Sequence, residues 1–152
     1  MTIGPFGSNL KVKDYQKRGV PLIFVREIRS ENFRREDTRF ISPEKANELA
    51  SHKVREGDVV ITKMGDPPGD TSIYPKGHPD AIATSDCLKL SPNLAVTSAE
   101  FLKYIIRSPV VKDQVLGISR GVAQQKMSLA RFKTLAIPLP PIEEQRRIVD
   151  EM

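Results

Sequence analysis

Three prolines stand within four residues near the end of the sequence, at Pro138, Pro140 and Pro141, and they strongly restrict the backbone there. Proline fixes φ and disfavours helix in the residue before it, yet it is well accommodated at the first position of a helix. We therefore expect Pro140 to end one element and Pro141 to open a helix. Glu143 suits the positive end of that helix and is spaced to pair with Arg147 at i,i+4.

Apolar residues recur in this last helix at the spacing of a coiled coil. Ile142, Val149 and Met152 follow the seam, and Gln145 interrupts it. We predict that these four residues face a partner. A helix of about one and a half heptads is marginal by itself, so we expect either a partner helix or a continuation of the chain.

The length and composition are those of one globular domain. The chain has 152 residues, of which 39% are hydrophobic and 28% charged, enough to bury a core without disulfides or metals. No apolar run approaches the roughly 18 residues of a membrane span, and nothing near Met1 resembles an export signal. Cys87 is the single cysteine, so no intramolecular disulfide can form and we expect a cytoplasmic protein without membrane contact.

The net charge of +5 is unevenly distributed along the chain. A basic segment attracts phosphate backbones. From charge alone, however, a solvated basic face explains such a segment as well as nucleic-acid binding does. Between residues 101 and 138, Asp113 is the single acidic residue, against Lys103, Arg107, Lys112, Arg120, Lys126, Arg131 and Lys133.

Apolar periodicity predicts a mixed α/β domain, with a mixed or antiparallel sheet flanked by short helices. The β-branched run at 59–62 is the clearest strand and should lie in the core. Further strands are expected at 21–28, at 71–74, at 81–90 with a break near Ser85 and Asp86, and at 135–139.

Capping serines mark the expected helices. Ser42 precedes a helix at 43–50, whose Ala46, Leu49 and Ala50 are expected to pack inward. The remaining helices are one that begins after Ser98, one that restarts at Ser108 and Pro109, and a short one from Ser128 to Phe132.

No catalytic constellation is visible in the sequence. The chain lacks a Walker loop, a dinucleotide fingerprint and a nucleophile elbow. His52 and His78 stand apart from any ligand-spaced cluster, so no metal site is expected. Asp-Pro-Pro at 66–68 resembles the acidic core of amino-methyltransferase active sites, but Gly69 stands where those have an aromatic residue. We interpret this segment as a loop-shaping turn.

Four motifs follow one another along nearly the whole chain. They are Gly-Pro-Phe-Gly-Ser at 4–8 with Asp14-Tyr15 and Gly19-Val20-Pro21, Arg-Glu-Gly-Asp-Val-Val-Ile-Thr at 55–62 with Gly65, Gly-Val-Ala-Gln at 121–124, and Ile-Pro-Leu-Pro-Pro-Ile-Glu-Glu-Gln at 137–145. Together they resemble a target-recognition domain from the specificity subunit of a type I restriction-modification enzyme. Such subunits usually carry two recognition domains, so the chain corresponds to one half.

The resemblance implies that residues 1–139 form a DNA target-recognition domain and that 140–152 begin a spacer helix. The domain would read one half of a bipartite double-stranded DNA target. Methyltransferase subunits using S-adenosylmethionine, and a restriction subunit using ATP, would carry the chemistry, so no cofactor or catalytic residue is expected here. The helix would dock these subunits and pair with a second half-subunit.

Sequence reading needs basic side chains on phosphates and planar hydrogen-bonding groups at base edges. The 120–126 loop offers both, with Gln124 or Gln125 suited to adenine, Arg120 to guanine and Lys126 to phosphate. Bracing of the loop by its glutamines explains those residues equally well.

Weaker candidates lie elsewhere in the chain. Lys63 follows directly after the central strand at 59–62, and Ser85 stands beside Asp86 at the expected strand break. Asp86 either accepts a hydrogen bond from a cytosine amino group or orients a neighbouring cation. Lys11, Arg34 and Arg35 are candidate phosphate contacts.

Two functions therefore remain in competition. The favoured one is a non-catalytic, sequence-specific DNA-binding module. The alternative is a protein-interaction module whose basic surface meets an acidic partner, without any DNA sequence preference. The target bases are not predicted, because no code links loop residues to bases.

Overall fold

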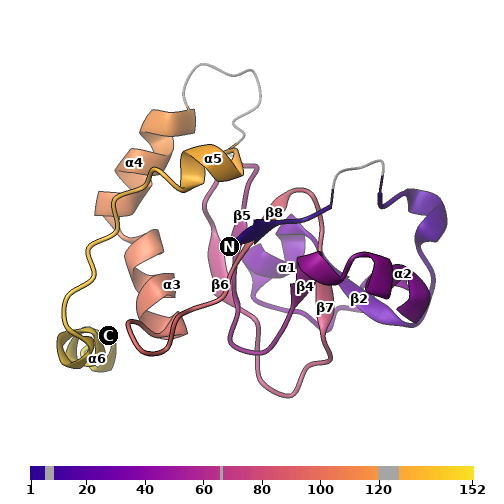
Figure 1. Cartoon of the computed structure of the whole chain (residues 1–152), viewed down its shortest axis with the longest axis horizontal. Coiled ribbons are helices and arrows are strands. Elements are labelled where there is room, and N and C mark those ends of the chain that lie inside the picture. Colours follow the sequence, from indigo (N-terminus) through magenta and orange to yellow (C-terminus); the bar gives the residue numbers. More distant parts are fainter. Residues whose placement is uncertain (6–8, 66, 120–126) are drawn as a thin grey trace.

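The computed structural model describes residues 1–5, 9–65, 67–119 and 127–152. Its strands form two four-stranded sheets that lie side by side along the long axis of the molecule (Figure 1). The longer helices gather at one end, beside the first sheet, and the second sheet occupies the other end. The expectation of a mixed α/β domain is confirmed, with two sheets in place of one.

The first sheet is antiparallel throughout. Its order is β1 (Thr2–Ile3), β8 (Cys87–Leu90), β5 (Val59–Thr62) and β6 (Thr71–Ile73). In β5, Val59 and Ile61 pack into the core shared with the helices, while Val60 packs into the core beside the second sheet. Because successive side chains of a strand point to opposite faces, this one β-branched strand joins both cores, which confirms its predicted central place.

The second sheet is mixed. Its order is β3 (Phe40–Ile41), β2 (Val20–Ile23), β7 (Ala81–Ala83) and β4 (Lys53–Val54), with β2 and β7 parallel and the other pairs antiparallel. A turn that bonds the Cys87 amide to the Thr84 carbonyl at 3.0 Å separates β7 from β8. This turn explains why the expected 81–90 strand contributes to two different sheets.

The strand predicted at 21–28 is correct as far as Ile23 and wrong beyond it. Helix α1 (Val25–Ser30) starts there instead. The carboxylate of Glu27, which is 1% exposed, accepts the Phe24 amide at 2.9 Å and so satisfies a backbone donor at the helix start. A buried acidic residue three positions after Phe24 therefore outweighs the alternating apolar pattern.

Serine caps begin three helices as predicted, namely α2 (Pro43–Glu48), α3 (Ala99–Arg107) and α5 (Leu129–Phe132). The capped amides are those of Lys45, Phe101 and Arg131, each 3.1 Å from its serine oxygen. Ala46 and Leu49 are buried as expected, but Ala50 is exposed, because the chain turns there into the short 3-10 helix η2 (Ala50–His52).

Helices α3 and α4 (Pro109–Ser119) cover the first sheet, and their buried faces form its core. Phe101, Ile106 and Val115 are at most 2% exposed and pack with Val59 and Ile61 of β5. At the other end of the molecule, the 3-10 helix η1 (Val12–Asp14) lies near α2.

The strand expected at 135–139 is absent from the structure. These residues run extended beside α4, and the Gln114 side chain holds them by accepting from the Ala136 amide at 2.9 Å and donating to its carbonyl at 3.0 Å. Pro138 and Pro140 have no amide to offer a sheet ladder, so a side-chain clamp takes the place of strand pairing.

The last helix, α6 (Ile142–Asp150), starts one residue later than predicted, with Pro141 as its N-cap. Glu143 pairs with Arg146 at 3.0 Å in place of the expected Arg147. The prediction that Gln145 faces a partner is wrong. Gln145 is 1% exposed, and its amide bonds within the chain to Thr97, Val96 and Pro140. The division at residue 139 stays a prediction.

Candidate nucleic-acid interface

Several strands end at one edge of the molecule, and the topology explains why. Because β2 and β7 are parallel, their carboxyl ends meet, and the Thr84 amide bonds to the Ile23 carbonyl at 3.0 Å. Strand β5 ends at the same edge, where the Lys63 amide bonds to the Asp86 carbonyl at 2.8 Å. Residues that follow three different strands therefore come together.

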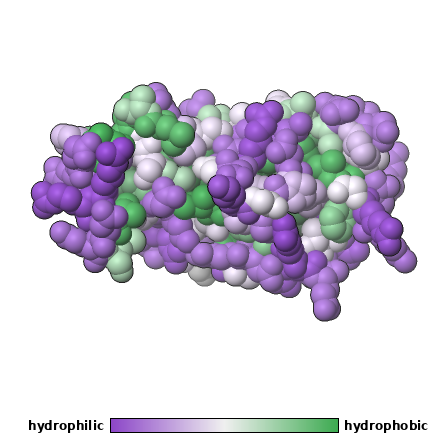
Figure 2. All heavy atoms as spheres, turned by 90° about the horizontal axis from the view of Figure 1, so that it is seen from below, coloured by the Kyte–Doolittle hydropathy of each residue, from purple (hydrophilic) through white to green (hydrophobic). Residues whose placement is uncertain are grey.

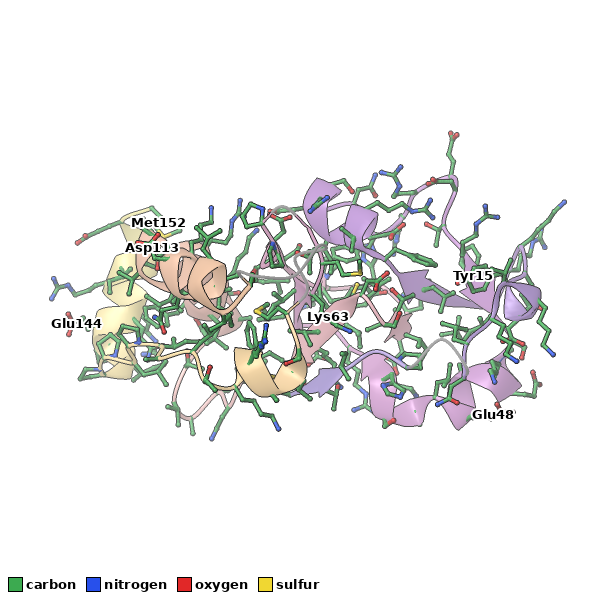
Figure 3. The ribbon with its side chains drawn as sticks, turned by 90° about the horizontal axis from the view of Figure 1, so that it is seen from above. Tyr15, Glu48, Lys63, Asp113, Glu144 and Met152 are labelled. Atoms are coloured by element: carbon green, nitrogen blue, oxygen red, sulfur yellow. The ribbon has the colours of Figure 1, made fainter. Side chains whose placement is uncertain are left out.

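The antiparallel edge of the second sheet adds further residues. Beside β2, the Leu22 amide bonds to the Arg39 carbonyl at 2.8 Å, and the Gln16 amide bonds to Phe40 at 2.9 Å, which places Tyr15 near Arg39. We call the resulting surface the strand-end face. It consists of Tyr15, Phe24, Arg26, Arg39, Lys63, Ser85 and Asp86, and Figure 3 shows Lys63 and Tyr15 in the view from above.

Two of the predicted DNA contacts meet on this face. Lys63 is half-buried, and its ammonium group donates to the Ser85 carbonyl at 3.3 Å. This contact leaves other hydrogen atoms of the ammonium group available to a phosphate oxygen, since lysine has three donors.

Four other predicted contacts, Arg120, Gln124, Gln125 and Lys126, lie outside the described residues. The residues on either side of this segment are placed. Ser119 is buried at the end of α4, and the amide of the buried Met127 bonds to the Lys63 carbonyl at 2.9 Å. Met127, the first described residue after this segment, thus lies directly beside Lys63 of the strand-end face, and the roles of the four residues stay predictions.

The three remaining candidates are not gathered around Lys63. Arg34 is exposed and donates to the Gly77 carbonyl at 2.7 Å, and Lys11 is exposed immediately before η1. Arg35 donates to Asp37 at 2.9 Å and lies 4.0 Å from the buried Glu27 carboxylate.

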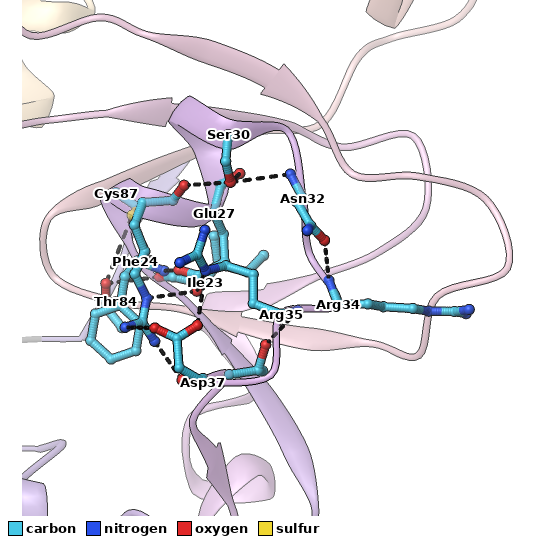
Figure 4. A network of polar contacts seen from close by, with 12 residues as sticks. Ile23, Phe24, Glu27, Ser30, Asn32, Arg34, Arg35, Asp37, Thr84 and Cys87 are labelled. Carbon is cyan, nitrogen blue, oxygen red and sulfur yellow. Dashed lines mark hydrogen bonds and ion pairs between the residues drawn. The ribbon is translucent and has the colours of Figure 1, made fainter.

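Arg35 belongs to a network of charged groups behind the face (Figure 4). Arg26 also pairs with Asp37, at 2.8 Å, and with Glu27, at 2.8 Å. The hydrogen bond from Arg35 lowers the pKa of Asp37, and the same bond raises the pKa of Arg35. Both arginines are thus charged but compensated, which makes them weaker phosphate ligands than an unpaired cation.

The basic segment at 101–138 is also less positive on the folded surface than its sequence indicates. Lys103 and Arg107 of α3 bond to the Glu31 carboxylate at 2.8 and 3.0 Å. Arg131 donates to the Ile118 carbonyl at 2.9 Å. Folding therefore pairs two of the seven cations with one carboxylate from outside the segment, which offsets one unit of their positive charge.

Comparisons with known proteins identify the family. The model of the type I restriction modification DNA specificity domain matches residues 11–152. This chain belongs to that family. The specificity domain is 31% identical to the EcoBI type I restriction enzyme specificity subunit of Escherichia coli over 133 residues, which cover 88% of this chain and 28% of that protein.

A solved structure supports the same conclusion. The HsdS subunit of Thermoanaerobacter tengcongensis superimposes with a TM-score of 0.56 and 29% sequence identity, covering 64% of this chain and 25% of that one. The specificity domain thus spans about a quarter of the length of each of these relatives. The matching family is that of a DNA specificity domain, which agrees with the expectation of a DNA-recognition module.

The specificity domain has a second feature, an apolar groove of about 520 Å³ between α3 and α6. Val149 and Met152, both predicted to face a partner, line it together with Ile73 and Tyr104. Ile142 is half-buried at the start of α6. Figure 2 shows hydrophobic residues among hydrophilic ones at this end of the molecule.

Other chemistry is not apparent in the described part of the specificity domain. His52 bonds to the Ile3 carbonyl at 2.6 Å, and His78 lies edge-on to Tyr74. No group of three or more His, Cys, Asp and Glu side chains within these residues is placed to hold a metal ion. Among the described helices, none has the length and apolar character needed to cross a membrane.

Four members of the strand-end face were not predicted from the sequence, namely Tyr15, Phe24, Arg26 and Arg39. Burial raises the pKa of Tyr15 above its usual value, the charge of Arg39 lowers it, and the nearby Asp14 and Asp86 carboxylates raise it. Phe24 was assigned to the interior of a strand, whereas it lies just after β2, as the N-cap residue of α1. Tyr15 stands in the opening motif, which was the single sequence signal that pointed to it.

Proposed function

We propose that this domain reads one half of a bipartite double-stranded DNA target and that its own residues carry no catalysis. The observation that carries the proposal is the strand-end face, where three strand ends and the flank of the 120–126 segment converge in a chain of the specificity-domain family. Lys63 holds the register on a phosphate, and polar side chains beside it meet base edges.

The proposal includes partners for the chemistry. Methyltransferase subunits supply S-adenosylmethionine and modify the target, and a restriction subunit supplies ATP-driven cleavage. Helix α6 docks these subunits or pairs with a second half-subunit through the groove lined by Val149 and Met152. The protein works in the cytoplasm, where its DNA target lies.

Selection from a pool of randomised duplexes tests sequence reading. We expect the full chain, with methyltransferase subunits present, to enrich one short half-site. The logarithm of its binding constant for that site should fall linearly with the logarithm of the salt concentration, with a slope of about −0.9 per phosphate contacted. Salt-dependent binding without enrichment would contradict sequence reading and restore the interaction module.

A matched pair of variants tests the part played by Lys63. Lys63→Gln should weaken binding to all duplexes alike and reduce the salt slope by about one contact. Arg147→Gln removes the same charge from the exposed side of α6 and should leave the slope unchanged. Equal slopes for both variants would exclude Lys63 from the interface.

Two measurements test whether the isolated chain lacks catalytic activity. Titration of S-adenosylmethionine into the isolated chain should produce no binding heat, and incubation with target duplex should produce no methylation. Methylation by the isolated chain would overturn the proposal.

A further inference from the structure

The strand-end face contains a pocket of about 290 Å³ that neither the sequence nor the family match singles out. Its walls are aromatic. The Tyr15 and Phe24 rings meet edge to face, with centroids 6.1 Å apart, and the Arg26 guanidinium lies 5.4 Å from the Phe24 ring centre. The charged side chains of Asp86 and Arg39 also line the pocket, together with Val25.

Arg26 forms part of the pocket wall, and three of its five N–H donors already bond to other residues. Its Nε donates to Glu27 at 2.8 Å, and its two terminal nitrogens donate to the Asp37 carboxylate and carbonyl at 2.8 and 2.7 Å. These bonds hold the guanidinium in place over the Phe24 ring. The pocket therefore keeps its shape before any ligand arrives, which lowers the entropy cost of binding.

Arg39 and Asp86 are different, because neither side chain bonds to another residue in the described part of the chain. Arg39 contributes its backbone carbonyl to Leu22, and Asp86 contributes its carbonyl to Lys63, so the main chain fixes both positions. The Lys63 ammonium group contacts the Ser85 carbonyl and does not pair with the Asp86 carboxylate. That contact argues against a role for Asp86 in orienting this cation.

We infer that this pocket reads one G·C base pair in the major groove, with Arg39 donating to guanine and Asp86 accepting from the cytosine amino group. The inference rests on the proposed function and deepens it. Guanine presents two adjacent acceptors, N7 and O6, and cytosine presents one donor, N4, whereas an A·T pair alternates acceptor, donor and acceptor. The paired N–H donors of Arg39 beside the Asp86 carboxylate match the pattern of a G·C pair and do not match that of an A·T pair.

The experiment compares base preference among variants of the full chain that keep their fold. Arg39→Lys keeps the charge but loses the planar fork that spans N7 and O6. We expect it to lower discrimination at one G·C position by about 5- to 150-fold, with an unchanged salt slope. Asp86→Asn should relax the same position, and Arg147→Lys on α6 serves as the control.

The possible outcomes separate this inference from the proposed function. If the wild-type chain shows no preferred sequence, both are overturned. If the wild type shows a preference that Arg39→Lys and Asp86→Asn retain, the pocket does not read bases and the proposed function stands. If Arg39→Ala weakens all duplexes equally while Arg39→Lys restores binding in full, Arg39 contacts phosphate and the inference is wrong.

Discussion

At the scale of single residues, Cys87 shows how burial controls reactivity. Its thiol is 0% exposed and lies 3.5 Å from the Ile23 carbonyl, and burial raises its pKa to about 12. Only the thiolate is nucleophilic. We predict that a thiol reagent at pH 8 leaves the native chain unmodified and modifies one thiol per chain in denaturant.

An exposed thiol provides the control for this measurement. In a Ser51→Cys variant, the new thiol on the surface should react at once, while Cys87 stays protected. Modification of the wild type at the rate of Ser51→Cys would contradict the burial of Cys87. Because burial raises the pKa of Cys87 in the folded state, the buried thiol contributes to the free energy of unfolding below the pH at which the unfolded thiol ionises. This contribution is lost as pH rises towards the folded-state pKa.

At the scale of elements, Gln145 attaches helix α6 to the rest of the domain. Its amide makes three bonds, of 2.8, 2.9 and 2.8 Å, to Thr97, Val96 and Pro140. Gln145→Leu keeps the size but leaves these polar partners unsatisfied. A buried unsatisfied group costs about 1–3 kcal/mol, so we predict a loss of about 2–4 kcal/mol in unfolding free energy by urea denaturation.

The exposed side of the same helix supplies a matched control. Arg147→Leu should change the unfolding free energy by no more than about 0.5 kcal/mol, because surface substitutions away from special contacts are nearly neutral. If Gln145→Leu is as stable as Arg147→Leu, the attachment of α6 does not depend on this amide.

At the scale of the whole molecule, Glu31 connects α1 to α3. It has a left-handed backbone, with φ of 52°, and its carboxylate bonds to Lys103 and Arg107. The hydrogen bond from Lys103, and then the second cation, hold the pKa of Glu31 below its ordinary value. A carboxyl with a lowered folded-state pKa stabilises the fold above the pH at which it titrates when unfolded, and this contribution is lost as pH falls.

Glu31→Gln should therefore be less stable than the wild type at pH 7, and the two should converge below pH 4. The difference at pH 7 should stay within about 1 kcal/mol, because exposed ion pairs are weak. Urea denaturation at both pH values measures it, and 1 M salt should reduce it. A difference that persists at low pH would show that the ion pairs are not its source.

Local patterns in the sequence were sufficient wherever the stabilising partner is a near neighbour in the chain. Ser98 and Ser128 bond to amides three residues away, so their helices could be predicted from spacing alone. The β-branched run at 59–62 is apolar on both faces, which indicates a central strand whatever its neighbours are. The order of the four motifs was likewise sufficient to predict the family.

Tertiary structure decided the features whose partners lie far away in the sequence. Residues 135–139 stay unpaired because the side chain of Gln114, which is 22 positions before Ala136, clamps them. Sequence patterns alone were enough to predict the α/β class, most helix starts and the specificity-domain family. Only the parallel pairing of β2 with β7 brings Arg39 and Asp86 to one pocket, because pairing register between distant strands is set by packing and leaves no local pattern.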